Sequence, residues 1–282
     1  MERKQKNTLA VHDISCVGRC SLTVALPIIS AMGIETSCIP TAVLSTHTGG
    51  FTGFTYRDLT DDIIPVFEHW KTLGITFDSI YSGFLGSGKQ IDILLKITNY
   101  YKKKGSLIIV DPVMADNGSL YKIFPADFPK GMARLCKNAD IIIPNITEAC
   151  LLVNEKYTQG PYTKEYIENL LKKLSLLAPK IVLTGVYFDI NRLGIACYDV
   201  KTNEINYYFA DKIEGYYHGT GDVFGSVITG AAVNKMPLPD ACRLAVDFTV
   251  AAIKTTKKEG RDIKYGVNFE ENLHLLTNYF KK

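Results

Sequence analysis

The chain has 282 residues, of which 46% are hydrophobic and 22% are charged, and its formal net charge of +3 is ordinary for a soluble globular protein. The lysine runs at 102–104, 172–173 and 257–258 lie beside amphipathic patterns, so solvated helix faces explain them, and the lack of a basic stripe argues against nucleic-acid binding. No apolar run reaches membrane-spanning length, which argues against a membrane protein.

The cysteines and the first residues indicate the cellular compartment. Seven cysteines, an odd number, are scattered between positions 16 and 242, and only Cys16 and Cys20 lie close together in sequence. A disulfide framework is unexpected in a chain of this size, so we interpret the cysteines as reduced thiols. The charged first residues are not followed by a long apolar segment and do not form a signal peptide. We therefore expect a cytoplasmic protein.

Short apolar segments rich in β-branched residues alternate with longer segments of helical period. The predicted strands cover residues 8–12, 35–40, 78–83, 106–110, 140–144 and 180–185, and several are apolar throughout, as expected for strands covered on both faces. Helices are predicted over 89–105, 163–179 and 239–260; in the second, Thr163 can cap the start and Pro179 follows the end. This alternation predicts an α/β fold with a mainly parallel central sheet between two layers of helices.

Residues 193–211 break the alternation. Two β-rich runs flank the polar turn KTNE, which predicts an antiparallel hairpin at one side of the sheet. No linker, repeat or low-complexity segment interrupts the chain, so we expect a single domain over residues 1–282. Polar pairs such as His12-Asp13 follow several predicted strands, and ligands of open α/β sheets bind beyond the carboxyl ends of the strands. The site is therefore expected at that edge.

The segment YYHGTGDVFGS, residues 216–226, joins a glycine-rich turn to a predicted helix. Glycines let backbone N–H groups converge on one point, and the helix dipole adds positive charge there, so the turn predicts a pocket for an anion such as phosphate. Asp222 lies beside this pocket, where a carboxylate repels an anion unless it takes a proton from an attacking hydroxyl. Taken alone, the G-x-G-D pattern is better explained as an ordinary helix start with an acid in its first turn.

Acids at two other strand ends give this turn its partners. Asp111 and Asp116 follow the strand at 106–110, and Glu148 lies one helical turn after the strand at 140–144. Taken alone, Asn145 and Glu148 are better explained as a helix cap with a capping-box acid. Carboxylate oxygens also suit Mg²⁺, which keeps several waters and bridges phosphates. Three acids at three strand ends, together with an anion pocket, favour a site for ATP and Mg²⁺.

The motifs HGTGD, DPVM and PNxxE resemble those of the ribokinase-like superfamily, and further segments are similar to its vitamin B6 (pyridoxal) kinase branch. These segments are LSTHTGG at 44–50, YSGFLGS at 81–87 and GSLY at 118–121, which are more specific than GTGD. The resemblance extends over nearly the whole chain and implies a ribokinase-like three-layer α/β sandwich and an ATP-dependent small-molecule kinase. The related hydroxymethylpyrimidine kinases usually carry Cys where this chain has Asp222.

The resemblance implies roles at the nucleotide site. Asp222 would be the general base for the 5′-hydroxymethyl group of a B6 vitamer. Charge on the transferring phosphoryl group would be stabilised by the backbone N–H groups of Gly219, Thr220 and Gly221. Asp111 and Glu148 would act on Mg²⁺ through water, and Thr184 matches a position that contacts nucleotide phosphate. The family also implies a homodimer and, in many members of the superfamily, a monovalent cation such as K⁺.

The resemblance also implies a pocket for the pyridine ring, with apolar and aromatic walls and a few polar groups. The matching positions are Asp13, Cys20, Leu44, His47, Thr48, Phe84 and Tyr121. Better-known B6 kinases have Ser where Asp13 stands and Tyr where Phe84 stands, so the preferred vitamer stays open. A carboxylate at position 13 can pair with a protonated pyridine nitrogen or with a substrate amine. Two glycines at 49–50 suggest a mobile flap over the substrate.

Ordinary structural roles compete with several of these assignments. A core histidine with a backbone partner is an alternative for both His12 and His47, and the better explanation for His12. Phe84 is equally well explained as a core residue. Cys20 is better explained as a pocket wall or a core thiol than as a nucleophile, because nothing nearby in the sequence would lower its pKa.

The sequence favours an ATP-dependent kinase of pyridoxal, pyridoxine or pyridoxamine, with a small-molecule substrate and neither nucleic acid nor membrane as partner. One alternative is a kinase of the same fold that acts on hydroxymethylpyrimidine or a sugar. The other is a non-catalytic regulator that binds nucleotide or vitamin. The segments at 44–50 and 82–87 favour a flat ring over a sugar, and the intact acids at 111, 148 and 222 argue against the regulator.

Overall fold

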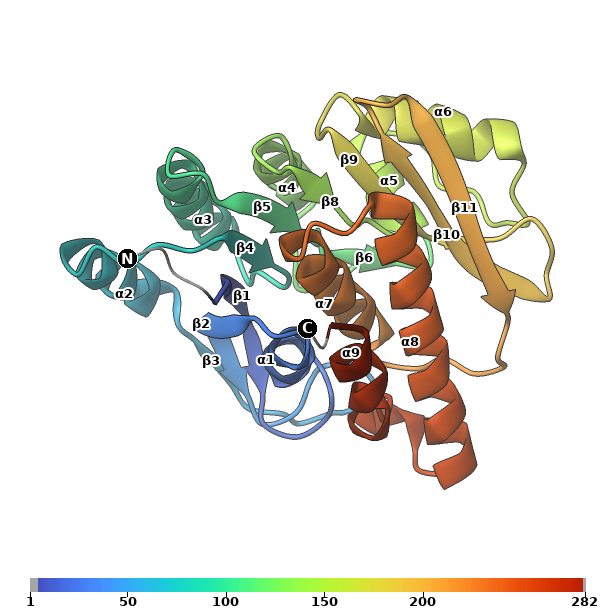
Figure 1. Ribbon diagram of the computed structural model, residues 1–282, viewed down its shortest axis with the longest axis horizontal. Helices are drawn as coiled ribbons and strands as arrows, with labels where there is room; N and C mark the ends of the chain where they lie inside the picture. The colour runs from blue at the N-terminus through green and yellow to red at the C-terminus, as the bar shows by residue number, and fades with distance from the viewer. Residues whose placement is uncertain (1–4, 281–282) are drawn as a thin grey trace.

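A computed structural model describes residues 5–280, and a nine-stranded sheet runs through its centre (Figure 1). The strand order is β11-β10-β9-β8-β5-β4-β1-β2-β3; the neighbours from β9 to β2 pair in parallel, and β11, β10 and β3 pair antiparallel at the two sides. The strands are β1 (Asn7–Ser15), β2 (Glu35–Leu44), β3 (Tyr56–Asp58), β4 (Ser79–Ser82), β5 (Leu107–Val110), β8 (Ile141–Ile142), β9 (Lys180–Val186), β10 (Arg192–Asp199) and β11 (Glu204–Asp211).

Helices cover both faces of this sheet (Figure 1). One face carries α1 (Leu22–Ala31), α7 (Thr220–Val233), α8 (Leu238–Glu259) and α9 (Leu273–Phe280). The other carries α2 (Thr60–Thr72), α3 (Gly88–Lys102), α4 (Phe128–Cys136), α5 (Ile146–Leu152) and α6 (Lys164–Leu174). The predicted three-layer α/β sandwich with a mainly parallel sheet is confirmed. None of the helices within residues 5–280 is long and apolar enough to cross a membrane.

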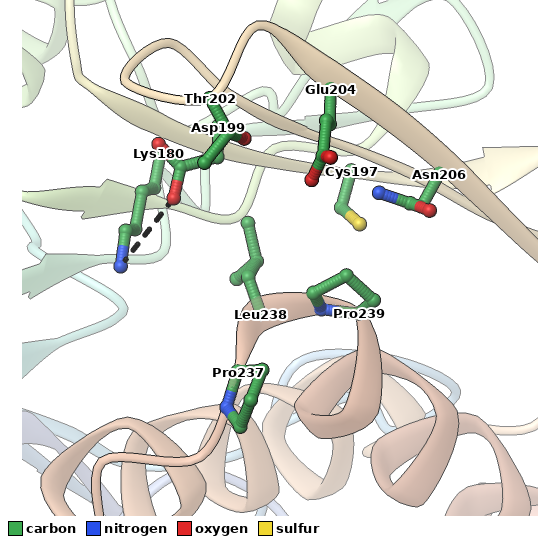
Figure 2. Close-up of a pocket in the computed structure, with 9 residues that line it drawn as sticks. All are labelled: Lys180, Cys197, Asp199, Thr202, Glu204, Asn206, Pro237, Leu238 and Pro239. Carbon is green, nitrogen blue, oxygen red and sulfur yellow. Dashed lines mark ion pairs between the residues drawn. The ribbon is translucent and has the colours of Figure 1, made fainter.

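The predicted hairpin at 193–211 is confirmed as β10 and β11, which extend the sheet at one side. At the amino end of β9, this hairpin and the start of α8 enclose a cavity of about 180 Å³ (Figure 2). Lys180 and Asp199 form an ion pair at 3.7 Å on its rim. Because parallel-sheet ligands bind at the carboxyl ends of the strands, this cavity lies at the opposite end from the expected site.

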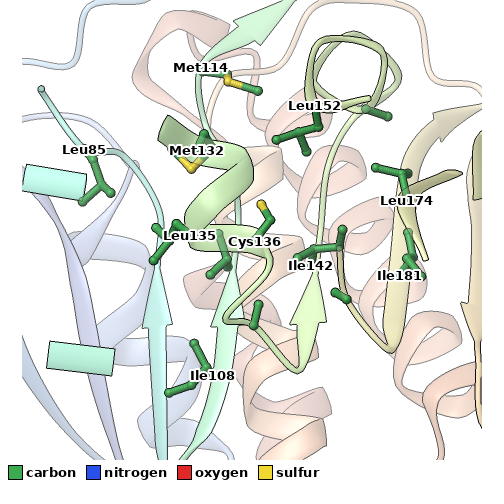
Figure 3. Packing of buried hydrophobic residues seen from close by; sticks show 14 of the residues in the cluster. Leu85, Ile108, Met114, Met132, Leu135, Cys136, Ile142, Leu152, Leu174 and Ile181 are labelled. Carbon is green, nitrogen blue, oxygen red and sulfur yellow. The ribbon is translucent and has the colours of Figure 1, made fainter. Parts of the chain in front are cut away.

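Each central strand sends alternate side chains into the two helical layers. In β1, Leu9 and Val11 pack with the layer of α2 to α6, whereas Ala10 packs with α1, α7 and α8. Figure 3 shows the first layer, where side chains of α4 lie over Ile108 of β5 and Ile142 of β8. Burial on both faces explains why the predicted strands are apolar throughout.

Several boundaries differ from the sequence prediction. β1 continues to Ser15 instead of ending at residue 12, because a register shift between His12 and Ile14 lets its pairing with β2 resume. His12 and Asp13 therefore lie within the strand. The predicted strand at 140–144 keeps only Ile141–Ile142. Two short strands, β6 (Ala115–Asp116) and β7 (Ser119–Leu120), form a separate hairpin that the sequence did not indicate.

His12 is fully buried against Tyr81, with ring centroids 4.4 Å apart. Among the described residues neither ring nitrogen has a hydrogen-bond partner, so the expected backbone partner is wrong. Burial lowers the pKa of His12 to about 3, which keeps the ring neutral. Position 83 requires glycine, because a Cβ there would lie 2.2 Å from Nδ1 of His12.

Candidate active site

The glycine turn forms the start of α7, as predicted. Gly219 caps the helix with a left-handed backbone (φ 76°), and Asp222 is the third residue of the helix. A Cβ at position 219 would lie 2.1 Å from the carbonyl oxygen of Arg19 and 3.6 Å from Sγ of Cys20. The turn therefore packs directly against the loop that follows β1, and only glycine fits there.

Asp222 lies where two groups of predicted residues meet. Its carboxylate interacts electrostatically with Asp13 on one side and Asp111 on the other. Burial raises the pKa of Asp222 to about 7, Asp13 adds to this rise, and the backbone N–H of Ser21 opposes it. A carboxylate with this pKa is suited to accepting a proton near neutral pH.

Asp111 directly follows β5, and Glu148 lies in the first turn of α5, which follows the neighbouring strand β8. Glu148 accepts hydrogen bonds from the backbone N–H groups of Asn145, at 2.9 Å, and Met114, at 3.1 Å. Burial raises the pKa of Glu148 to about 8. The pKa of Asp111 is also raised, by burial first and then by the charges of Glu148 and Asp222. Burial is the main cause of both shifts, since it disfavours the charged form of a carboxylate.

The capping box predicted for Asn145 and Glu148 is confirmed. Glu148 nevertheless lines the same cavity as Asp111, so its capping role and a role toward a cation are compatible. Within residues 5–280 no three side chains of the His, Cys, Asp or Glu type come together as a metal site. The acids fit a Mg²⁺ that keeps most of its waters and takes further oxygens from phosphate.

A cavity of about 510 Å³ runs from Asp222 along the carboxyl ends of the strands. The predicted residues that line it are Asp111, Tyr121, Glu148, Thr184, Gly219, Thr220, Gly221 and Asp222. Its far wall is apolar and comes from β10 and α8, with Leu193, Val246, Val250 and Ile253. The sequence did not indicate this apolar wall, because the β10–β11 hairpin was predicted only as an edge of the sheet.

Four of the residues predicted for the pyridine ring gather on the other side of Asp222. Asp13 is buried and accepts hydrogen bonds from Oγ of Ser21, at 2.5 Å, and Oγ of Ser15, at 3.2 Å. Cys20 is close enough to Asp13 and Asp222 that both charges, after burial, raise its thiol pKa. Its neutral thiol agrees with a wall rather than a nucleophile.

His47 and Leu44 complete this side. The buried Leu44 pairs with Ser15 in the β1–β2 register. Nε2 of His47 donates to the carbonyl of Lys264 at 2.6 Å, while Nδ1 accepts from the backbone N–H of Gly49 at 3.1 Å. These two bonds fix a neutral ring, and burial lowers the pKa of His47.

The remaining three predicted residues lie elsewhere. Thr48 is exposed on the loop after β2. Phe84 is half-buried and packs on Phe124 with ring centroids 5.8 Å apart, against the core of the α2–α6 layer. Tyr121 lines the large cavity with Asp111 and Glu148, so it lies with the predicted nucleotide residues rather than with Asp13 and His47.

Sequence reasoning missed several residues of this region. Tyr216 and His218 line the cavity, and they directly precede the glycine turn, so their position beside GTGD was an available signal. Ser21 holds Asp13 from a strained backbone with φ 57°. Lys264 comes from a late segment that meets the flap, and nothing in the local sequence indicated that contact.

Comparison with known proteins identifies the family. Residues 26–267 match the family described as phosphomethylpyrimidine kinase. The chain belongs to this family.

Its relatives include pyridoxal kinases. One relative is a Bacteroides thetaiotaomicron protein described as a phosphomethylpyrimidine kinase and crystallised with pyridoxal. It is 38% identical to this chain, and the match covers 97% of this chain and 96% of that one, with a TM-score of 0.92. Pyridoxal kinase from Lactobacillus plantarum is 31% identical over 97% of both chains, with a TM-score of 0.89. Pyridoxal kinase from Dictyostelium discoideum is 24% identical over 92% of this chain and 89% of its own length. The protein is thus an ATP-dependent small-molecule kinase with a ribokinase-like fold.

The contact between Gly219 and Arg19 gives a direct test of the turn. Gly219→Ala places a methyl group against a backbone carbonyl in a left-handed conformation, so we expect the melting temperature to fall and activity to be lost. Gly221→Ala is the matched control, because a Cβ there meets no atom within 4 Å. Thermal unfolding should give a lower melting temperature for Gly219→Ala than for Gly221→Ala. Equal melting temperatures would contradict the close contact.

Proposed function

We propose that this protein is a vitamin B6 kinase that phosphorylates the 5′-hydroxymethyl group of pyridoxal, pyridoxine or pyridoxamine. The observation that carries the proposal is the position of Asp222, between the acids of the large cavity and the side that holds Asp13 and His47. In the reaction, the alcohol oxygen attacks the γ-phosphorus of ATP and the bond to the ADP oxygen breaks. The alcohol proton passes to Asp222.

The large cavity would hold ATP. The apolar wall of Leu193, Val246 and Ile253 suits the base, and the start of α7 suits the phosphates, because its N–H groups and its helix dipole are positive there. Charge on the transferring group would be stabilised by Gly219, Thr220 and Gly221. Thr184 lines the same cavity and would contact the nucleotide phosphates.

Asp111 and Glu148 would hold Mg²⁺ through its waters, and the ion would neutralise charge on the phosphates. The raised pKa values of both acids support this role, since a cation at that position favours their ionised forms. A monovalent cation such as K⁺ stays a prediction from the family resemblance.

Asp13, Cys20, Leu44 and His47 would surround the ring, and Tyr121 would reach in from the nucleotide side. Contacts of Thr48 and Phe84 with the ring stay predictions from the family resemblance. The relative crystallised with pyridoxal, at 38% identity, supports this assignment. Asp13 can accept from a protonated ring nitrogen or a substrate amine. Burial raises the pKa of Asp13, so a cationic partner would restore its ionised form.

Hydroxymethylpyrimidine is the second candidate substrate, because the family is described by phosphomethylpyrimidine kinase. Both substrates are flat heteroaromatic rings with a hydroxymethyl group, and the same base and phosphate site would serve either. A single domain over residues 1–282, a homodimer and a cytoplasmic location stay predictions.

An ADP-release assay with Mg·ATP tests the proposal. Pyridoxal, pyridoxine, pyridoxamine and hydroxymethylpyrimidine are offered side by side, and we expect turnover on at least one B6 vitamer. Turnover on hydroxymethylpyrimidine alone would identify that compound as the substrate and leave the proposed mechanism unchanged. No turnover on any of them by folded, ATP-binding protein would reject both candidates.

Asp222→Asn should leave the binding of ATP and vitamer nearly unchanged while kcat falls by roughly two to four orders of magnitude, as for the loss of a general base. Because the pKa of Asp222 is about 7, kcat/KM of the wild-type enzyme should fall about tenfold per pH unit below that value. The residual activity of the variant should lack this dependence. A variant that keeps the wild-type kcat or pH profile would show that Asp222 is not the base.

Glu148→Gln should raise the Mg²⁺ concentration needed for half-maximal activity several-fold, since a neutral amide attracts the hydrated ion less. The amide oxygen can still accept from the N–H of Asn145, so α5 should keep its cap. Glu165→Gln, at an exposed position in α6, is the control. An unchanged Mg²⁺ titration would exclude the metal role of Glu148.

A further inference from the structure

A row of rings links the two sides of the candidate active site. The ring centroids of Phe51 and His47 are 5.1 Å apart, those of His47 and His218 are 5.2 Å apart, and those of His218 and Tyr216 are 5.1 Å apart. The row ends where the hydroxyl of Tyr216 donates to Oδ2 of Asp116 at 2.5 Å. We call these five residues the ring row.

The ring row joins segments that are far apart in sequence. Phe51 and His47 come from the loop after β2, His218 and Tyr216 from the segment before α7, and Asp116 from the β6–β7 hairpin. His47, the second residue of the row, is close enough to Asp13 for the charge of Asp13 to act on it. The opposite end of the row lies on the large cavity, which Asp116, Tyr216 and His218 all line. The row therefore runs from the proposed vitamer side to the proposed phosphate side.

The flap rests directly on His218. A Cβ at Gly49 would lie 2.6 Å from the His218 ring, and a Cβ at Gly50 would lie 3.5 Å from its Nε2. The first distance excludes a side chain at position 49, whereas the second is an ordinary van der Waals contact, so Gly49 is the glycine that this approach to His218 requires. Any ligand that moves His47 or the flap must also move the ring of His218 or lose this contact.

Tyr216 is held by few contacts. It is 56% exposed, and the residue before it is Gly215, with φ 125°. The described interactions of its side chain are the ring contact with His218 and the hydrogen bond to Asp116. Contacts of this kind are each worth about 0.5–1.5 kcal/mol, so ligand binding is strong enough to form or break them.

We propose that the ring row couples the two substrate sites, so that occupation of the vitamer side closes Tyr216 and Asp116 over the phosphates of ATP. His218 and Tyr216 are then positioning residues, and each substrate strengthens the binding of the other by the same factor. Closure also excludes water from the γ-phosphate. If water attacked there instead of the alcohol, the γ-phosphorus–oxygen bond of ATP would break to give ADP and phosphate. This inference rests on the proposed B6 kinase function.

The test measures coupling as well as activity. The Kd of β,γ-imido-ATP with Mg²⁺ is measured by calorimetry with and without saturating pyridoxine, and the ratio of the two values is the coupling factor. We expect a factor of at least about five for the wild-type protein. Tyr216→Phe, which keeps the ring and loses the hydroxyl, and His218→Ala should bring the factor close to one.

His218→Phe restores an aromatic ring and should recover most of the coupling. With saturating pyridoxine, the ADP released per pyridoxine phosphorylated should rise above one in Tyr216→Phe and His218→Ala, because the phosphates then stay open to water. Tyr208→Phe is the matched control, because it removes a similar exposed bond, from the Tyr208 hydroxyl to Asp247 at 2.7 Å, between β11 and α8. Its coupling factor should equal that of wild type.

A wild-type factor of one overturns the inference, and so does an unchanged factor in Tyr216→Phe and His218→Ala. An equal loss in Tyr208→Phe would also overturn it, because the effect would then not depend on the ring row. Failure of the proposed function is read separately, from vitamer turnover by the wild-type enzyme. A wild-type enzyme that phosphorylates pyridoxine without coupling keeps the function and rejects this inference.

Discussion

The contact between Gly219 and the carbonyl oxygen of Arg19 determines how the two halves of the site meet. The loop after β1 lies against the start of α7 without room for a single Cβ. This approach brings Ser21 and Asp13 to one side of Asp222 while the acids of β5 and α5 lie on the other. The proposed transfer needs an alcohol, a base and a phosphate at one point, and the distance between them is set by this backbone contact.

Crowded carboxylates are the second consequence of this geometry. Asp13, Asp111, Glu148 and Asp222 all have pKa values raised by burial. For Asp222 the folded protein holds its proton up to about pH 7, whereas the unfolded chain releases it near pH 4. Ionising this group therefore lowers the stability of the free protein as the pH rises between these values.

The sequence predicted the features that repeat or that follow local rules. Apolar runs marked the buried strands, and the acids after strand ends converged because parallel strands finish at one edge. The helix predicted over 163–179 begins after its expected cap Thr163 but ends at Leu174, before Pro179 is reached. The residues around the ring came from family resemblance. Features set by distant contacts were missed: β1 passes its predicted end through a register shift, and Tyr216 meets Asp116 across 100 residues of sequence. His12 lacks the partner expected for it because its neighbours are Tyr81 and Gly83, which only the sheet order brings together.

The order of the chain has a consequence for folding. The sheet from β1 to β11 and the layer of α2 to α6 are complete in sequence by residue 211, but α7, α8 and α9, which cover most of the other face, come after it. During synthesis this apolar face of the sheet therefore stays largely uncovered until the last quarter of the chain has been made, and an uncovered apolar face is prone to aggregation. The same late segment carries the glycine turn and Asp222. Burial of the second core layer and assembly of the site are thus one event, and a chain interrupted before residue 219 lacks both.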